Sequence, residues 1–432
     1  MKIGIIGSGI AGLSAAWLLG RTHEVTLFER HARPGMGAFN LQYSEAGIDA
    51  TIDVPLRAFN DGYYENLTAL YAMIGVETSH ADHSAGFSMK GATSDFLSYR
   101  YLGWRKSAFP MMDNLRSLGL SSLLIAKDMA VFQLVAPRDL AAGRADDMTV
   151  LDYLETAGYS RVFIDRLMLP TLAAIGTCTY EAAAAYPAAL VIKFYAGGLL
   201  FNNIWRAQHG ADDAIDRMLA NSRDIRCNTS VTRVESSEDG SGVQVDFDGG
   251  SAQFDHVVIA SQANQARELV AHEEAEASAL LSKIDYQASE LVVHSDPKFA
   301  PARGRSTAPL QFLLDPLADK PMASIQLNHL YPQLKKARPI FQTWNPLVQP
   351  DEDYVLGRAM FERPVVTLES LAALKSLAQL HQQPGRRIWY CGSYAVPGIP
   401  LQESGVQSAM VIAARLDCPA PWLVAAAEER AA

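Results

Sequence analysis

The stretch Lys2-Ile3-Gly4-Ile5-Ile6-Gly7-Ser8-Gly9-Ile10-Ala11-Gly12 decides the fold of this chain. The apolar run over residues 2–6 predicts a buried strand, and residues 13–19 predict an apolar helix. Residues 24–29 predict a second strand that ends in Glu29. The spacing G-x-G-x-x-G lies between the first strand and the helix, so these parts form one β-α-β unit.

The three glycines of this unit have separate physical roles. Gly7 permits a tight turn, Gly9 lets the backbone approach a pyrophosphate, and Gly12 lets helix and strand pack closely. The helix N-terminus directs unpaired N–H groups at the anion, and Glu29 stands where a carboxylate accepts hydrogen bonds from ribose hydroxyls. The unit therefore predicts a bound dinucleotide. A secretory signal is the alternative, but its cleavage site would not need the phosphate-turn spacing.

Length, net charge and apolar content indicate which kinds of binding partner to expect. The chain has 432 residues and a net charge of −10, which predicts two or three domains and argues against nucleic acid. No integral membrane segment is expected, because Lys127 and Asp128 interrupt the most apolar stretch, residues 118–135. That stretch predicts a helix lining a pocket, with a membrane-surface contact as the alternative. The sequence leaves the oligomeric state open.

The cysteines and histidines predict no metal and no disulfide. The four cysteines form no C-x-x-C pair, which favours reduced thiols in a cytoplasmic protein. The ten histidines show no ligand spacing. The cysteines are Cys178, Cys227, Cys391 and Cys418.

Predicted elements alternate along the chain in a way that indicates a discontinuous domain. Further strands are predicted over 225–234, 242–247, 255–260 and 387–392, with a hairpin turn at Asp239-Gly240 and short strands over 286–345. Helices are predicted over 64–75, 366–381 and 403–416, and the aromatic-rich stretch 79–205 is predicted to be mostly helical, with segments near 111–135, 148–157, 160–169 and 180–195. We therefore expect a nucleotide-binding domain from 1–78, 206–270 and 385–418, a substrate-binding domain from 79–205 and 271–384, and a frayed tail over 419–432.

Four blocks of the sequence resemble FAD-dependent amine oxidases and desaturases of the glutathione-reductase-like superfamily, in particular its branch of predicted NAD/FAD-binding proteins. The blocks are residues 7–35, residues 52–67, residues 254–260, and residues 389–392 with 403–409. The resemblance implies an α/β fold in which a Rossmann-like FAD-binding domain is interleaved with an α+β substrate domain. The alternative cofactor is NAD(P).

The resemblance also implies which residues hold FAD. Gly392 ends a strand where a side chain would collide with the cofactor, and Gly405 lies at a helix start that favours the electron-rich part of the flavin. Arg33 resembles the arginine that approaches the diphosphate, although a solvated loop residue is the alternative. The implied set is Gly7, Gly9, Ile10, Ala11, Gly12, Glu29, Arg30, Arg33, Val231, Gly392, Ser393, Glu403, Ser404, Gly405 and Val406.

Two departures from the pattern lie where cofactor would meet substrate. The usual adjacent glycines are replaced by Gly35-Met36-Gly37, and Asp-x-Gly becomes Asp53-Val54-Pro55. Pro55 fixes φ and removes a backbone donor. These changes affect the expected chemistry more than the expected cofactor.

The candidate catalytic residues are Tyr64, Trp344, Tyr394 and Arg57. The aromatic residues would align a substrate carbon for hydride transfer to flavin N5, with core packing as the alternative. Arg57 would anchor a carboxylate, or else form a structural ion pair. Lys298 is expected at the surface.

We expect an oxidase, dehydrogenase or desaturase that acts on an apolar amine or acyl chain and passes electrons to O2 or another acceptor. The alternatives are a flavin-dependent isomerase and a non-catalytic flavoprotein.

Overall fold

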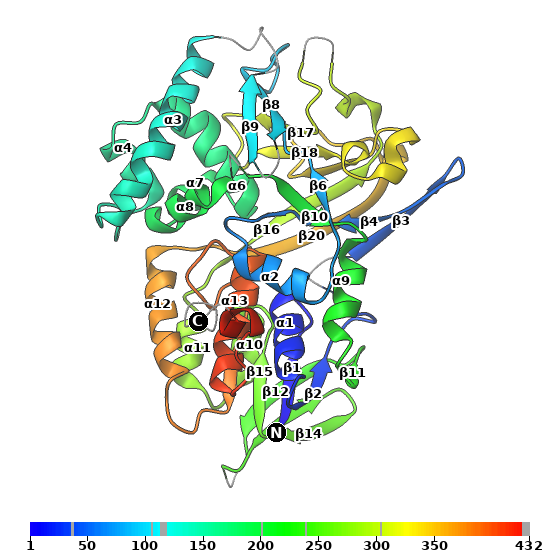
Figure 1. Cartoon of the computed structure of the whole chain (residues 1–432), viewed down its shortest axis with the longest axis vertical. Coiled ribbons are helices and arrows are strands. Elements are labelled where there is room, and N and C mark those ends of the chain that lie inside the picture. Colours follow the sequence, from blue (N-terminus) through cyan, green and yellow to red (C-terminus); the bar gives the residue numbers. More distant parts are fainter. Residues whose placement is uncertain are drawn as a thin grey trace.

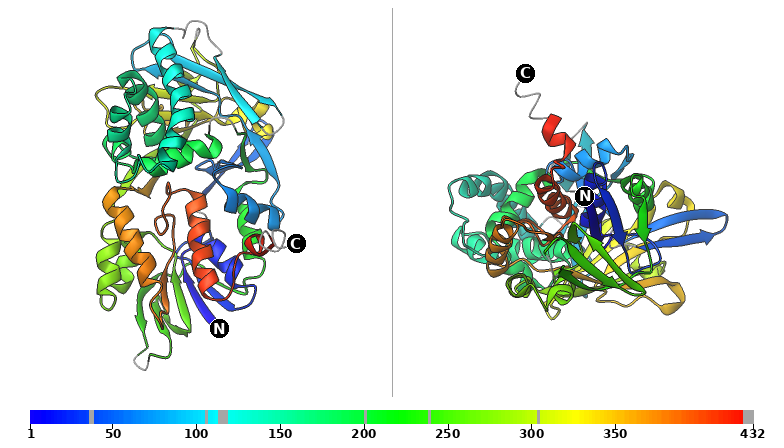
Figure 2. Two further views of the ribbon diagram at one scale, coloured as in Figure 1. Left: turned by 60° about the vertical axis from the view of Figure 1, so that its left-hand side comes forward. Right: turned by 90° about the horizontal axis from the view of Figure 1, so that it is seen from below.

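The computed structural model describes residues 1–35, 39–104, 107–112, 119–199, 202–237, 240–302 and 305–425. A lower part is built on a parallel sheet and an upper part on a larger mixed sheet (Figure 1). The two parts stay distinct when the molecule is turned (Figure 2).

The parallel sheet brings together strands from the start, the middle and the end of the chain. Its order is β11-β2-β1-β15-β21, and every neighbouring pair is parallel. The strands are β1 (Lys2–Ile6), β2 (Glu24–Phe28), β11 (Asp224–Arg226), β15 (His256–Ile259) and β21 (Ile388–Tyr390). The central strand is apolar on both faces because both are covered. The predicted α/β class is confirmed.

Helices cover one face of this sheet, and helices with a small sheet cover the other. Ile5 packs with α1 (Ile10–Leu19), α2 (Glu65–Met73), α9 (Gly210–Leu219) and α13 (Gln402–Arg415). Ile6 points the other way, into a core shared with α10, α11, α12 and an antiparallel sheet of three strands. Those elements are α10 (Ala263–Val270), α11 (Ala275–Leu281), α12 (Leu368–Leu380), β12 (Val231–Ser236), β13 (Val243–Phe247) and β14 (Gly250–Phe254).

Two of these helices come from the stretch assigned by sequence to the substrate-binding domain. α11 and α12 lie within 271–384, yet Leu281, Leu374 and Leu377 are buried in the core of the parallel sheet. The lower part therefore continues through α11 and begins again at α12, so the boundaries expected at residues 270 and 385 lie inside it.

The upper part contains an eight-stranded sheet of order β20-β16-β19-β18-β17-β7-β8-β9, in which β17 and β7 are parallel. Its strands are β7 (Ala85–Met89), β8 (Leu97–Trp104), β9 (Ser107–Met112), β16 (Tyr286–His294), β17 (Leu310–Leu314), β18 (Met322–Gln326), β19 (Phe341–Trp344) and β20 (Val355–Pro364). A helical layer covers it: α3 (Leu120–Ala141), α4 (Val150–Thr156), α5 (Arg161–Phe163), α6 (Leu169–Gly176), α7 (Tyr180–Ala184) and α8 (Ala188–Phe194).

Short elements connect the two parts. β5 (Phe59–Asn60), β10 (Ile204–Ala207) and β6 (Thr78–Ala81) form a three-stranded sheet, and β3 (Phe39–Glu45) pairs with β4 (Ile48–Val54). Wider π-helical turns follow α5 and α8, at Ile164–Met168 and Tyr195–Leu199. Single 3-10 turns lie at Pro297–Phe299, Leu327–His329, Pro332–Lys336 and Glu352–Tyr354.

The prediction of a mostly helical stretch over 79–205 is wrong for its first third. β7, β8 and β9 occupy this region, because Leu97, Tyr99 and Tyr101 alternate with polar residues and therefore lie on one face of a strand. Pro187 separates α7 from α8 within the single segment predicted over 180–195. The helices over 64–75, 366–381 and 403–416 are confirmed as α2, α12 and α13.

The apolar helix α3 is long and apolar enough to cross a membrane by length and composition alone. In the structure it packs into the upper part through Ile125 and Phe132. Its buried Asp128 accepts a hydrogen bond from the Ser160 backbone N–H at 2.9 Å. A carboxylate fixed in this way indicates a helix that belongs to the protein core along one face.

The described part of the C-terminal tail, residues 419–425, packs against the lower part of the molecule. A helical turn spans 421–425, and Trp422 stacks on Trp17 with ring centroids 6.2 Å apart. The Trp422 indole N–H donates to Asn66 Oδ1 at 3.1 Å. Residues 426–432 lie outside the described residues.

Candidate active site

The loop between β1 and α1 has the geometry of a phosphate cradle. Gly7 has φ +100°, which only glycine adopts readily, and a methyl group at Gly12 would lie 2.0 Å from the Gly7 carbonyl oxygen. A methyl group at Gly9 would instead meet no atom within 4 Å. Among the described residues no side chain caps α1, so its first N–H groups stay available to an anion.

A second helix begins beside this loop. α13 packs against α1, and a methyl group at Gly405 would lie 2.7 Å from Ile10 Cγ2. The Ser408 hydroxyl accepts a hydrogen bond from the Gly392 N–H at 3.0 Å and so holds the end of β21 against α13. Two helix N-termini and the ends of β1 and β21 therefore converge, which suits a ligand with a diphosphate and an electron-rich ring.

Glu29 lies at the end of β2, as the motif predicts. Its carboxylate accepts hydrogen bonds from the backbone N–H and the hydroxyl of Ser8 and, at 2.9 Å, from the His31 N–H. These contacts orient the carboxylate beside the glycine loop. Its role toward a ribose remains a prediction.

The remaining predicted cofactor residues lie in different surroundings. Glu403 is buried and its carboxylate accepts hydrogen bonds from the Asn66 and Leu67 N–H groups, at 3.2 and 2.9 Å, so it caps α2. Arg33 is exposed and forms an ion pair with Asp212 at 3.0 Å. Arg30 is exposed, and Val231 begins β12. Met36 and Gly37 of the departing segment lie outside the described residues.

A cavity of about 760 Å³ leads from the cradle into the upper part. Its lower wall includes Gly9, Ile10 and Ala11 from the first loop and Gly392, Ser393 and Tyr394 from the β21–α13 loop. Its upper wall is mainly apolar and aromatic, with Leu97, Tyr99, Tyr101, Ile125, Met129 and Phe312. The predicted cofactor loops and the substrate part therefore share one cavity.

Two guanidinium groups line the same cavity. Arg57 follows β4, and Arg363 lies near the end of β20. Burial, and then the charge of Arg363, lower the pKa of Arg57 to about 10. Burial also lowers the pKa of Arg363. Both charges act on the nearby Tyr64 hydroxyl, whose pKa is nevertheless raised by burial.

The candidate aromatic residues do not all reach the cavity. Tyr64 and Tyr394 line it, and burial raises the pKa of Tyr394 well above its usual value. Trp344 lies behind the wall, where its ring centroid is 5.6 Å from the guanidinium carbon of Arg363. Trp344 therefore positions Arg363, which lines the cavity, and does not line it itself.

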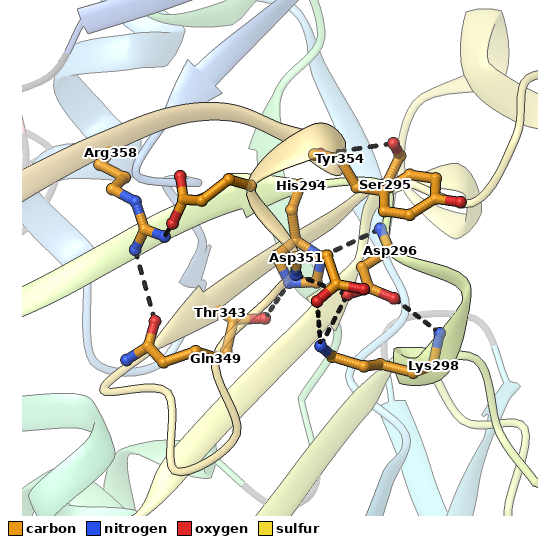
Figure 3. A network of polar contacts seen from close by, with 10 residues as sticks. His294, Ser295, Asp296, Lys298, Thr343, Gln349, Asp351, Tyr354 and Arg358 are labelled. Atoms are coloured by element: carbon orange, nitrogen blue, oxygen red, sulfur yellow. Dashed lines mark hydrogen bonds and ion pairs between the residues drawn. The ribbon is translucent and has the colours of Figure 1, made fainter.

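Lys298 lies in a polar network away from the cavity, as expected (Figure 3). Its Nζ pairs with Asp296 at 3.0 Å and with Asp351 at 3.4 Å. The neighbouring His294 is buried, and its Nε2 lies 2.8 Å from the Thr343 hydroxyl. This network lies at the end of β16, and its residues are not part of the lining of the cavity.

The profile for flavin containing amine oxidoreductases matches residues 10–323. The chain belongs to the flavin-containing amine oxidoreductase family. This family binds FAD, and no curated protein matches the chain by sequence.

Solved structures of several enzymes share the fold of this chain. Putrescine oxidase bound to putrescine aligns with 96% of this chain and 99% of its own, with a TM-score of 0.65 and 14% identity. Cyclohexylamine oxidase from Brevibacterium oxydans aligns over 96% and 99%, with a TM-score of 0.62 and 16% identity. The CLA-producing fatty acid isomerase from P. acnes aligns over 96% and 98%, with a TM-score of 0.64 and 15% identity.

Sequence reasoning missed several polar residues of this cavity, among them Arg363 and His83. Arg363 shares the inner face of β20 with Ala359 and Phe361, whereas Arg358 and Met360 on the other face are exposed. A charged residue in phase with the inner apolar positions of a strand was the available signal. His83 precedes β7 and gave no comparable signal.

Proposed function

We propose that this chain binds FAD in the cradle and oxidises an apolar small molecule held in the adjoining cavity. The observation that carries the proposal is the continuity of that cavity, which joins the loops at Gly9 and Gly392 to the apolar upper wall. The cradle suits the cofactor because the space beyond Gly9 is open and two helix N-termini face it.

We assign different roles to the cofactor loops and to the tyrosines of the cavity wall. Bound FAD supplies the acceptor, flavin N5, for a hydride from the substrate. The loops at Gly9 and Gly392 would hold the cofactor, and the N-terminus of α13 would stabilise an electron-rich group bound beside it. Tyr64 and Tyr394 keep neutral hydroxyls, because burial raises their pKa values, and they exclude water from the substrate carbon.

The apolar lining of the cavity supports an apolar substrate. Amines and acyl chains both fit an apolar cavity, and the structural neighbours include enzymes named for putrescine, for cyclohexylamine and for a fatty acid. We therefore propose oxidation with O2 or another acceptor as the main reaction. An isomerase that returns the hydride to the same substrate is the second candidate, favoured by the likeness in fold to a fatty acid isomerase.

Anaerobic mixing of the flavin-loaded protein with apolar amines and acyl compounds tests the proposal. Lasting bleaching of the flavin absorption is expected for an oxidase or dehydrogenase. Product formation without net bleaching or oxygen use would instead establish the isomerase. Absence of bleaching and of product with every compound would contradict catalysis at this site.

A further inference from the structure

The helix α3 carries an exposed face made almost only of apolar residues. Ten of its residues are exposed, of which eight are apolar and two are basic; they are Leu120, Leu123, Ala126, Lys127, Ala130, Val131, Leu134, Val135, Arg138 and Ala141. The exposure is large, since Leu120 is 76% exposed and Leu134 is 64% exposed. The outward face of a helix in a water-soluble protein is normally polar. An apolar face of this size indicates a surface that binds a partner.

The opposite side of α3 is fixed in the protein core. The buried residues of the helix follow one another at intervals of three or four and are Ser122, Ile125, Asp128, Phe132, Ala136 and Asp139. Only 28% of its most apolar 18-residue window is buried. Since one side packs into the upper part, the helix in this fold can lie along an apolar surface but cannot cross a membrane.

The exposed face of α3 borders an opening of the cavity. Four exposed residues of β9 and α3 also line the cavity: Pro110, Met112, Ala126 and Ala130. A residue in contact with both the solvent and the cavity lies at the rim, so the cavity opens between these two elements. Both elements lie in the upper part of the molecule, away from the cofactor loops (Figure 1). The rim is apolar on both sides, and the neighbouring Met111 is 54% exposed.

The segment that carries this face has the opposite charge to the chain as a whole. Residues 97–141 contain six basic residues and three acidic ones, a net charge of +3, whereas the net charge of the chain is −10. On α3 both acidic residues, Asp128 and Asp139, are buried, and both basic residues, Lys127 and Arg138, are exposed. Lys127 Nζ pairs with Asp128 at 3.0 Å, yet the Lys127 side chain stays 64% exposed. The exposed charge of α3 is therefore positive.

We propose that the exposed face of α3, together with Met111 and Met112 of β9, docks on a lipid membrane with anionic headgroups. Its leucines and methionines would enter the boundary between headgroups and acyl chains, and Lys127 and Arg138 would contact lipid phosphates. The inference goes beyond the proposed function, because docking requires no turnover. Entry of an apolar substrate from the bilayer through the opening would follow from docking and rests on the proposed function.

A second copy of the chain fits this face less well than a membrane does. Two identical faces related by a twofold axis would bring the exposed cations of both copies together. All of α3 is described, and it offers no exposed carboxylate to pair with them. Like charges that meet across an interface oppose association. Anionic lipids instead supply negative charge along the whole face.

Cosedimentation of the purified protein with lipid vesicles tests the inference. The vesicles consist of phosphatidylcholine, with or without phosphatidylglycerol. We expect binding to be at least about tenfold tighter with phosphatidylglycerol and to weaken as salt is added, because the lipid charge attracts the exposed cations. Leu123→Gln and Leu134→Gln are each expected to weaken binding at least about fivefold, since each removes an apolar group from the acyl boundary. Arg138→Gln is expected to weaken binding to the anionic vesicles about fivefold and to leave binding to the neutral ones unchanged.

The matched controls change exposed side chains away from this face. Met360→Gln removes a side chain that is 64% exposed, as Leu134 is, from β20, the strand at the other edge of the upper sheet. Lys375→Gln removes an exposed cation from α12 in the lower part. Both variants should bind vesicles as the unsubstituted protein does. An unchanged unfolding midpoint checks the fold of each variant.

No binding to either kind of vesicle, or an equal loss of binding in Met360→Gln and Leu134→Gln, would overturn the inference. A dimer in analytical ultracentrifugation that Leu134→Gln converts to monomers, without vesicle binding, would also overturn it and assign the face to a second copy. Vesicle binding without oxidation of any substrate would contradict only the proposed function. Oxidation without vesicle binding would contradict only this inference.

Discussion

Two glycines of one motif illustrate how residues of the same type have opposite physical roles. Gly12 is required by packing, because a methyl group there would lie 2.0 Å from the Gly7 carbonyl oxygen. Gly9 is surrounded by open space, so the folded chain does not require it. The missing side chain at Gly9 therefore matters only for a ligand that binds in this space.

Substitution of these glycines should therefore separate folding from binding. Gly9→Val is expected to keep the unfolding midpoint of the cofactor-free protein and to lose bound flavin, because the side chain would fill the cradle. Gly12→Ala is expected to lower the free energy of unfolding by about 1–3 kcal/mol, the usual cost of overpacking. Denaturant unfolding and flavin content per chain measure both. A Gly9→Val protein with full flavin content would contradict the placement of the cofactor.

The residues of the site could be predicted only where they belong to one local motif. Gly7, Gly9, Gly12 and Glu29 are close in sequence, and their geometry follows from one β-α-β unit. The alternation along β20 places Arg363 on the inner face of its strand, but the pairing of β20 with β16, which the local sequence does not specify, decides that this face meets the cavity. Long-range pairing therefore limits prediction of the substrate wall.

Single elements are held by contacts between distant parts of the chain. Glu403, in the first turn of α13, accepts hydrogen bonds from the first N–H groups of α2, and Gln407 Nε2 donates to it at 2.8 Å. The negative charge also complements the positive N-terminal end of α2. One carboxylate thus ties two helices together.

Glu403→Gln should weaken this joint. The substitution keeps the size of the side chain but turns an amide N–H₂ toward backbone donors, so the free energy of unfolding is expected to fall by about 1–3 kcal/mol. Urea unfolding of the cofactor-free protein measures the change. Glu65→Gln is the control, since Glu65 is an exposed carboxylate in the first turn of α2, the helix that Glu403 caps. Equal midpoints for the two variants would show that Glu403 does not stabilise α2.

The elements themselves were predictable where hydrophobic periodicity is strong. Helices α2, α12 and α13 were expected within a few residues of their observed bounds. The strands over 78–112 were not, because abundant aromatic residues suit both strands and buried helices, and only their alternation distinguishes the two.

Across the whole molecule, buried histidines couple folding to pH. Burial lowers the pKa of His294 to about 4 and that of His381 to about 3, so both are neutral when folded. The unfolded chain protonates them near pH 6.5, and it therefore binds more protons than the folded chain below that pH. This contribution to stability is complete above pH 6.5 and is lost as pH falls.

The free energy of unfolding is accordingly expected to fall by about 2 kcal/mol for each of these histidines between pH 7 and pH 5. Urea unfolding at the two pH values measures it. His294→Gln should reduce the difference, whereas His272→Gln, at an exposed position, should not. Stability that is constant or higher at pH 5 would contradict the neutral state of the buried rings.

The assembly of the molecule from distant segments was predictable in outline. Apolar strands at the start, middle and end of the chain indicate one parallel sheet, and β1, β15 and β21 lie side by side in it. The exact boundaries between the two parts were harder to predict, because α11 lies between lower-part α10 and upper-part β16, and α12 lies between upper-part β20 and lower-part β21. Each helix joins the lower core through contacts that are distant in sequence.

Denaturation of freshly purified protein, followed by mass spectrometry and absorption spectroscopy of the released small molecules, tests directly whether this chain binds FAD. The predicted result is one FAD per chain. Non-covalent FAD would be released on denaturation, and covalent FAD would be found attached to a peptide. A colourless protein that takes up no FAD on reconstitution and binds NAD(P)H tightly would contradict it.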